Sequence, residues 1–74
     1  MMMLEPRLAY DDCIVGVVRR CGQEEAFCYD AQKVVGVLEG MGMEEEEAWE
    51  FFDFNVQGAY AGEGSPFFLY AVDV

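Results

Sequence analysis

Residues 26–41 read AFCYDAQKVVGVLEGM, and this stretch decides how the rest of the chain is divided. Its first four residues form a short apolar run, which predicts one strand of a small sheet. Asp30 follows the run and can cap a helix through its carboxylate. Beyond this cap, apolar residues recur at helical spacing on one face: Ala31, Val34, Val35, Leu38 and Met41. The stretch therefore predicts a strand that passes directly into an amphipathic helix, which Gly40 or Gly42 ends.

A second helix is predicted downstream, beginning near residue 44 and reaching about residue 57. Glutamates crowd its first turn, where negative charge interacts favourably with the positive end of the helix dipole. At about 100° per residue, one face carries Ala48, Phe51, Phe52 and Asn55, flanked by Trp49, Phe54 and Val56. The opposite face carries Glu46, Glu50, Asp53 and Gln57. The helix is therefore expected to bury an aromatic face and to expose a line of carboxylates.

The C-terminal part is predicted to contain a loop and a second strand. Gly58, Gly62 and Gly64 bracket the loop. After Pro66, residues 67–72 form an apolar run rich in aromatic side chains, which predicts a strand. This strand is the expected partner of residues 26–29.

Upstream of the opening stretch, residues 13–20 allow two interpretations. Asp11 or Asp12 can cap a helix there, and Gly22 is a natural stop. The β-branched residues of the run favour a strand, but the run lacks the alternation of a half-buried strand. The cap and stop signals favour the helix, with the strand as the alternative.

Together these elements predict an α+β fold, with two or three short helices packed on a minimal two-stranded antiparallel sheet. Residues 1–7 are expected to be a frayed N-terminus, and residues 8–74 a single small domain. A chain of 74 residues has room for only one core, because it buries only about 60% of the surface that it exposes when unfolded. Both strands would be edges, which leaves open a homodimer through a strand edge.

Composition narrows the class of partner. The chain is 54% apolar and 15% aromatic, so it can fold although fifteen acids against four bases give a net charge of −11. This charge excludes direct binding to nucleic acid and disfavours an anionic membrane. Residues 1–6 lack the basic start and the apolar stretch of a secretory signal, which predicts a cytoplasmic protein.

No cofactor, metal or catalytic activity is expected. The chain has no histidine, and its three cysteines, Cys13, Cys21 and Cys28, lack the spacing of a zinc or redox motif. They are interpreted as thiols that act as small apolar side chains. General acid–base chemistry would depend on Asp or Glu alone, and a cysteine nucleophile would have no histidine to activate it.

The feature most suggestive of function is the acidic face of the second helix. Glu46, Glu50 and Asp53 lie on it, and neither Lys nor Arg follows Lys33 in the chain. A rise of about 1.5 Å per residue places Glu46 about 6 Å from Glu50 and about 10 Å from Asp53 along the axis, like a line of backbone phosphates. Such a line could bind a basic groove that normally holds nucleic acid. A solvated face without a partner is the alternative.

The candidate partner-binding residues are Glu44, Glu45, Glu46, Glu47, Trp49, Glu50 and Asp53, and the anionic surface could extend to Asp11, Asp12, Glu24, Glu25 and Glu63. Trp49 is included as an exposed aromatic anchor beside the carboxylates, and Tyr60 is a weaker candidate. The expected partner is a basic protein. A different hypothesis is a structural or regulatory adaptor that binds through apolar and aromatic contacts, with the charge serving solubility.

Several segments bear a resemblance to known sequences: residues 14–22 (IVGVVRRCG), 28–30 (CYD), 42–48 (GMEEEEA) and above all 54–67 (FNVQGAYAGEGSPF). The chain resembles, over about residues 8–69, a family of small uncharacterised proteins encoded in phages and other mobile elements. The resemblance implies no established activity. It implies a setting, the cytoplasm of a host cell, in which small acidic phage proteins commonly inhibit host machinery, anti-CRISPR proteins among them.

One position departs from the pattern of that family. Where this chain has Glu44, the family often has Thr or Ser, which are better helix caps than Glu. A further negative charge therefore replaces a cap. The sequence leads to the expectation of an anti-CRISPR-like inhibitor that mimics DNA with an acidic helix face and binds a nucleic-acid-binding subunit of a host defence complex.

Overall fold

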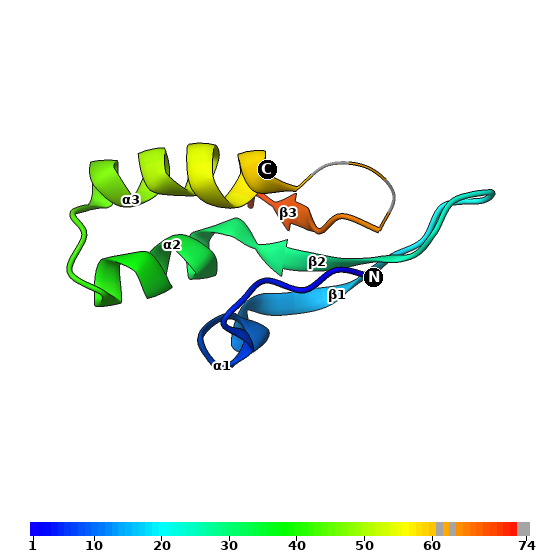
Figure 1. Ribbon diagram of the computed structural model, residues 1–74, viewed down its shortest axis with the longest axis horizontal. Helices are drawn as coiled ribbons and strands as arrows, with labels where there is room; N and C mark the ends of the chain where they lie inside the picture. The colour runs from blue at the N-terminus through cyan, green and yellow to red at the C-terminus, as the bar shows by residue number, and fades with distance from the viewer. Residues whose placement is uncertain (61, 63, 73–74) are drawn as a thin grey trace.

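The computed structural model describes residues 1–60, 62 and 64–72, and it shows a three-stranded sheet that continues into a pair of helices (Figure 1). The elements in chain order are α1 (Arg7–Tyr10), a 3-10 turn (Asp11–Cys13), β1 (Ile14–Val18), β2 (Ala26–Asp30), α2 (Ala31–Gly40), α3 (Glu45–Phe51), a π-helical turn (Phe52–Val56), a second 3-10 turn (Gln57–Ala59) and β3 (Phe67–Leu69). The predicted α+β class is confirmed.

The sheet differs from the predicted one in strand number and in direction. Its order is β1-β2-β3, with β1 antiparallel and β3 parallel to β2. The strand that was not predicted is β1, and the strand predicted to be antiparallel is β3. A two-stranded antiparallel sheet is therefore wrong, and the sheet is three-stranded and mixed.

The preferred helix over residues 13–20 is wrong, and the alternative strand is right for its central part. β1 pairs with β2 from Ile14 opposite Tyr29 to Val18 opposite Ala26, with a register irregularity between Ile14 and Gly16. β-branched side chains pack well in such a pair, and this tertiary pairing outweighs the local helix signals. Asp11 and Asp12, the predicted cap residues, lie in the short 3-10 turn, which has no side-chain capping bond, while Gly22 adopts a positive φ of 80° between the strands.

The parallel direction of β3 follows from its connection. The chain leaves β2 through α2, returns through α3, and enters the sheet again at β3 in the same direction as β2 (Figure 1). A helical crossover of this kind joins parallel strands, whereas a tight turn joins antiparallel ones. β3 is also shorter than the predicted strand over residues 67–72, because its pairing with β2 ends at Leu69.

The opening stretch of the sequence folds as predicted. Asp30 Oδ1 accepts hydrogen bonds from the backbone N–H groups of Gln32, at 2.9 Å, and Lys33, at 3.3 Å, and so caps α2. At the other end Gly42 adopts a φ of 105°, a conformation that favours glycine. Of the five residues predicted to line the core face, only Met41 is exposed, at 58%, because it lies just beyond the last residue of α2.

The second helix is longer than α3 alone and changes its winding. It passes from α3 into the π-helical turn and then into the 3-10 turn, and Figure 1 shows one continuous coil. Ala48, Phe52 and Val56 are buried, whereas Phe51 and Asn55 are exposed, contrary to the prediction from a regular wheel. The π-helical turn has more residues per turn than an α-helix, so residues four positions apart face the same side. The buried face of this segment therefore consists of other residues than an α-helical wheel predicts.

One hydrophobic core joins the sheet to the helices. Its buried members are Leu4, Tyr10, Cys13, Tyr29, Ala31, Val34, Val35, Leu38, Ala48, Phe52 and Val56. Phe52 lies at its aromatic centre, with its ring edge-on to Phe68 at a centroid distance of 5.0 Å and to Trp49 at 5.8 Å. The acidic helix is therefore held in place by its aromatic side.

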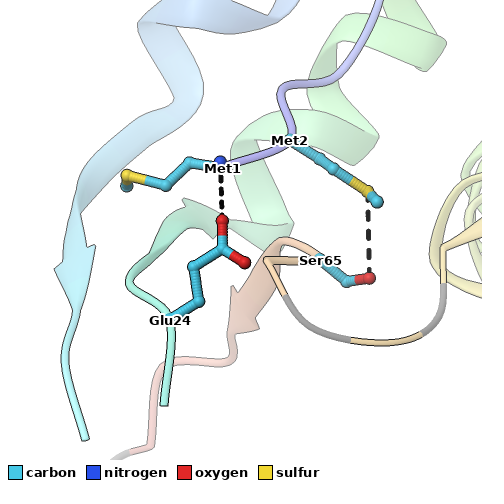
Figure 2. A network of polar contacts seen from close by, with 4 residues as sticks. All are labelled: Met1, Met2, Glu24 and Ser65. Carbon is cyan, nitrogen blue, oxygen red and sulfur yellow. Dashed lines mark hydrogen bonds and ion pairs between the residues drawn. The ribbon is translucent and has the colours of Figure 1, made fainter.

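The N-terminal segment is folded onto the domain, although the sequence predicts that residues 1–7 fray. Leu4 is only 2% exposed, and its N–H donates a 2.8 Å hydrogen bond to the Tyr29 hydroxyl. Figure 2 shows the Met1 amino group 3.2 Å from a Glu24 carboxylate oxygen, and the Ser65 hydroxyl directed at the Met2 sulfur. Burial of Leu4 supplies the apolar contact that a frayed segment would lack.

Candidate functional site

Four glutamates surround one shallow depression at the start of α3. They are Glu44, Glu46, Glu47 and Glu50, and we call them the acidic surface. All four side chains are exposed. Glu44 is the residue before the helix and has an extended backbone with a ψ of 160°, and its side chain makes no capping bond. Its carboxylate is therefore left for solvent or a partner.

The remaining predicted acidic residues of this helix adjoin the acidic surface. Glu45 is the first residue of α3 and Asp53 lies in the π-helical turn, and both are exposed. The wheel selected Glu46, Glu50 and Asp53 as a line, whereas the depression unites two of these residues with Glu44 and Glu47. Sequence periodicity missed this grouping because Glu44 precedes the helix and does not follow its angular spacing.

No cation within the described residues forms an ion pair with the acidic surface. The ion pairs among the described residues join Met1 to Glu24, Arg7 to Asp11 and Arg19 to Glu25, and all three lie outside α3. The repulsion between the four glutamates is offset in part because Glu46 and Glu47 lie in the first turn of α3 and Glu44 just before it, where the helix dipole favours negative charge. Their arrangement exposes concentrated negative charge without a local counter-charge.

The predicted extension of the anionic surface lies on other elements. Asp11 and Asp12 precede β1, and Glu24 and Glu25 lie just before β2 on the hairpin arm, which projects away from α3 in Figure 1. Three of these carboxylates already have ion-pair partners. Glu63 lies outside the described residues. The acidic surface is therefore a local feature of α3 in the part of the chain that the structure describes.

Trp49 is half-buried and serves as a support for the acidic helix. Its ring stacks on that of Tyr70, at a centroid distance of 6.0 Å and an interplanar angle of 23°, and meets Phe52 edge-on. The Tyr70 hydroxyl donates a 2.9 Å hydrogen bond to Gln57 Oε1. Tyr60, the weaker aromatic candidate, is also half-buried against the core.

The aromatic side chains that this helix exposes differ from the one predicted from the sequence, which was Trp49. Phe54 is 79% exposed and Phe51 is 37% exposed. A regular wheel places Phe51 in the core and Phe54 at its margin, so the π-helical turn was needed to reveal both. Apolar contact area therefore lies on the same helix as the carboxylates.

Two of the three cysteines, Cys13 and Cys28, are at least partly buried. Burial raises the pKa of the Cys13 thiol, and burial likewise raises the pKa of Cys28, with nearby Asp30 adding to the effect. A raised pKa keeps a thiol protonated and unreactive at neutral pH. In the described ranges, residues 1–60, 62 and 64–72, no three His, Cys, Asp or Glu side chains are placed to hold a metal ion.

The buried phenol and thiol groups predict a loss of stability at alkaline pH. Burial raises the pKa of Tyr29 above 10.0 and that of Cys13 above 9.0, which are their ordinary values. Between the unfolded and folded pKa values only the unfolded chain releases these protons, so the free energy of unfolding falls as pH rises. Urea midpoints should be constant up to about pH 8.5 and fall progressively above about pH 9. Cys13→Ala should weaken the first part of this fall, and a midpoint that stayed constant beyond about pH 10.5 would contradict the assignment.

Comparisons with known proteins identify no relative. No protein-family model matches the chain, and no curated protein or solved structure does so. Among the described residues, no helix is sufficiently long and apolar to span a bilayer.

Proposed function

We propose that the protein is a non-enzymatic inhibitor, encoded by a phage or mobile element, that binds a basic nucleic-acid-binding surface of a host defence complex. The observation that carries the proposal is the acidic surface, in which four exposed carboxylates surround one depression and lack an ion-pair partner among the described residues. An anti-CRISPR protein acting in the host cytoplasm is the most concrete form of this function.

The fold supports mimicry of a nucleic-acid backbone because the carboxylates stand on a supported helix. Ala48 and Phe52 anchor the other side of that helix in the core with no exposed surface. Because the helix is already held by the core, its backbone need not be ordered on binding, and a basic groove releases bound counter-ions when it receives the carboxylates. The proposed inhibitor would occupy the groove in place of nucleic acid, and it needs no cofactor.

A salt series tests whether charge carries the interaction. The protein, immobilised through a tag, would be exposed to lysate of a host cell at low ionic strength and then washed with rising salt. Because exposed charges are screened beyond about 10 Å at 0.1 M salt, a groove-bound partner should elute steeply over the low-salt range. The eluted proteins should be nucleic-acid-binding proteins, and added DNA should compete with the capture. Retention at high salt would contradict the proposal.

An apolar adaptor is the second candidate, and the exposed Phe51 and Phe54 favour it. Phe54 in particular leaves 79% of its surface exposed. An adaptor would bind through these rings, with the net charge of −11 serving solubility. Phe54→Ser would then weaken binding at every salt concentration. If the carboxylates carry the interaction, the same substitution should leave the salt-sensitive binding largely intact.

A further inference from the structure

The outer edge of β1 is an open strand edge. β1 is the first strand in the order β1-β2-β3 and pairs only with β2 among the described residues. Backbone hydrogen bonds from other described segments do not reach it. Edge strands are usually protected against further pairing by charged residues, proline or bulges. β1 has no charged residue and no proline, and its register irregularity is confined to the stretch between Ile14 and Gly16. Val15 and Val17 are also 48% and 47% exposed.

The charges that flank β1 are arranged to match those of a second copy. Asp12 lies two residues before the strand and Arg20 two residues after it, and both are exposed. Neither belongs to an ion pair among the described residues, whereas their neighbours Asp11 and Arg19 are paired with Arg7 and Glu25. One end of the edge is thus left with an acid and the other end with a base.

We infer that two copies of the chain pair antiparallel through β1, about a twofold axis at Gly16. In that register Asp12, in the 3-10 turn just before β1, comes to the same end of the paired strands as Arg20 of the other copy, so an acid meets a base at both ends. Val15 lies opposite Val17 of the other copy, a β-branched cross-strand pair. The two sheets become one sheet of six strands. This interface is independent of the proposed function.

Electrostatic repulsion between the two negatively charged copies does not strongly oppose dimerisation through β1. The acidic surface belongs to α3, which Figure 1 places across the molecule from β1, beyond β2 and β3. Pairing through β1 therefore leaves the two acidic surfaces on the outer sides of the dimer. Repulsion between them is screened at ordinary ionic strength, since the Debye length is then about 8 Å.

A charge swap tests the register in solution. Sedimentation velocity over a range of protein concentrations should show a monomer–dimer equilibrium for the unmodified chain. Asp12→Arg places like charges at both ends and should weaken dimerisation about tenfold, and Arg20→Asp should do the same. The double variant, D12R with R20D, should restore the original affinity. Glu39→Arg, on the exposed surface of α2, makes the same change in net charge as Asp12→Arg and should not weaken the dimer.

Disulfide trapping provides a second readout that does not depend on affinity. A β-carbon at Gly16 would have open space around it, so Gly16→Cys should leave the fold intact. In a Cys21→Ser, Cys28→Ala background, which removes the exposed thiol and the thiol directly opposite Gly16 in β2, mild oxidation should link the two introduced thiols across the axis, because directly opposed residues lie about 4.5–5.5 Å apart at their Cα atoms. Gln32→Cys in the same background is the control and should form no covalent dimer. A chain that stays monomeric throughout, or a double variant that fails to recover, would overturn the inference.

Discussion

Replacing Glu46, Glu50 and Asp53 together with lysine is expected to abolish binding to the basic partner. The triple variant changes the net charge by six. At the acidic surface two lysines then stand beside the two remaining glutamates, so the attraction for a basic groove is cancelled. Each close interfacial charge pair can contribute about 1.5 kcal/mol or more, so the loss should exceed a hundredfold in affinity. The measurement is the affinity for the captured partner, by calorimetry or by loss of inhibition.

The same variant should remain folded, so that a loss of binding can be assigned to the changed side chains and not to unfolding. All three side chains are exposed and none is among the ion pairs of the described residues. The three lysines repel one another at the same spacings as the carboxylates that they replace, by about 0.2–0.5 kcal/mol per pair, so the helix gains no large penalty and circular dichroism should be unchanged. Glu39→Lys on α2 is the single-site control and should bind normally. Full inhibition by the triple variant would refute the proposed function.

Phe52→Ala is expected to destabilise the protein strongly. Phe52 has no exposed surface, and its ring meets those of Trp49, Phe68 and Tyr70. Deleting a buried phenylalanine ring costs about 3–5 kcal/mol, because both the burial and the filled volume are lost. A domain of 74 residues has a total stability of only about 4–11 kcal/mol. The variant should therefore lose most of its stability, with a fall in Tm of about 15–30 °C.

Phe54→Ala is the matched control for this loss. It removes the same ring, two positions away in the same helical segment, from a side chain that is 79% exposed. A surface substitution of this kind usually changes stability by less than about 0.5 kcal/mol. Comparable melting temperatures for the two variants would contradict the position of the core described here.

The sequence predicted the elements whose signals are local. Asp30 caps α2 and Gly42 ends it, because a cap and a positive φ depend on a few neighbouring residues. β1 could not be decided in this way, since its strand conformation depends on pairing with β2, which no local pattern reports. The direction of β3 likewise depends on the route of the chain through two helices.

For the candidate site, the sequence predicted which kind of side chain is exposed, but not which of the glutamates lie around one depression. Exposure of the glutamates followed from their position in the first turn, whereas the joining of Glu44 to Glu46, Glu47 and Glu50 required three-dimensional coordinates. The π-helical turn had no sequence signal that we can name, and it decided which aromatic rings are buried. Trp49 was expected at the surface because a regular wheel places it beside the carboxylates, although its ring packs against those of Tyr70 and Phe52.

The parallel crossover also determines the order in which the fold can be completed. β1, β2 and the two helices contact segments that are close in the sequence. The pairing of Phe68 with Tyr29, by contrast, joins residues that are separated by more than half of the chain. Contacts between distant residues form late, so β2 keeps one apolar edge uncovered while the chain is being synthesised. Most of the acidic residues precede β3 and are already present in that unfinished state. Mutual repulsion between such nascent chains would keep them apart, so the same charge that costs stability in the finished fold protects its assembly from aggregation.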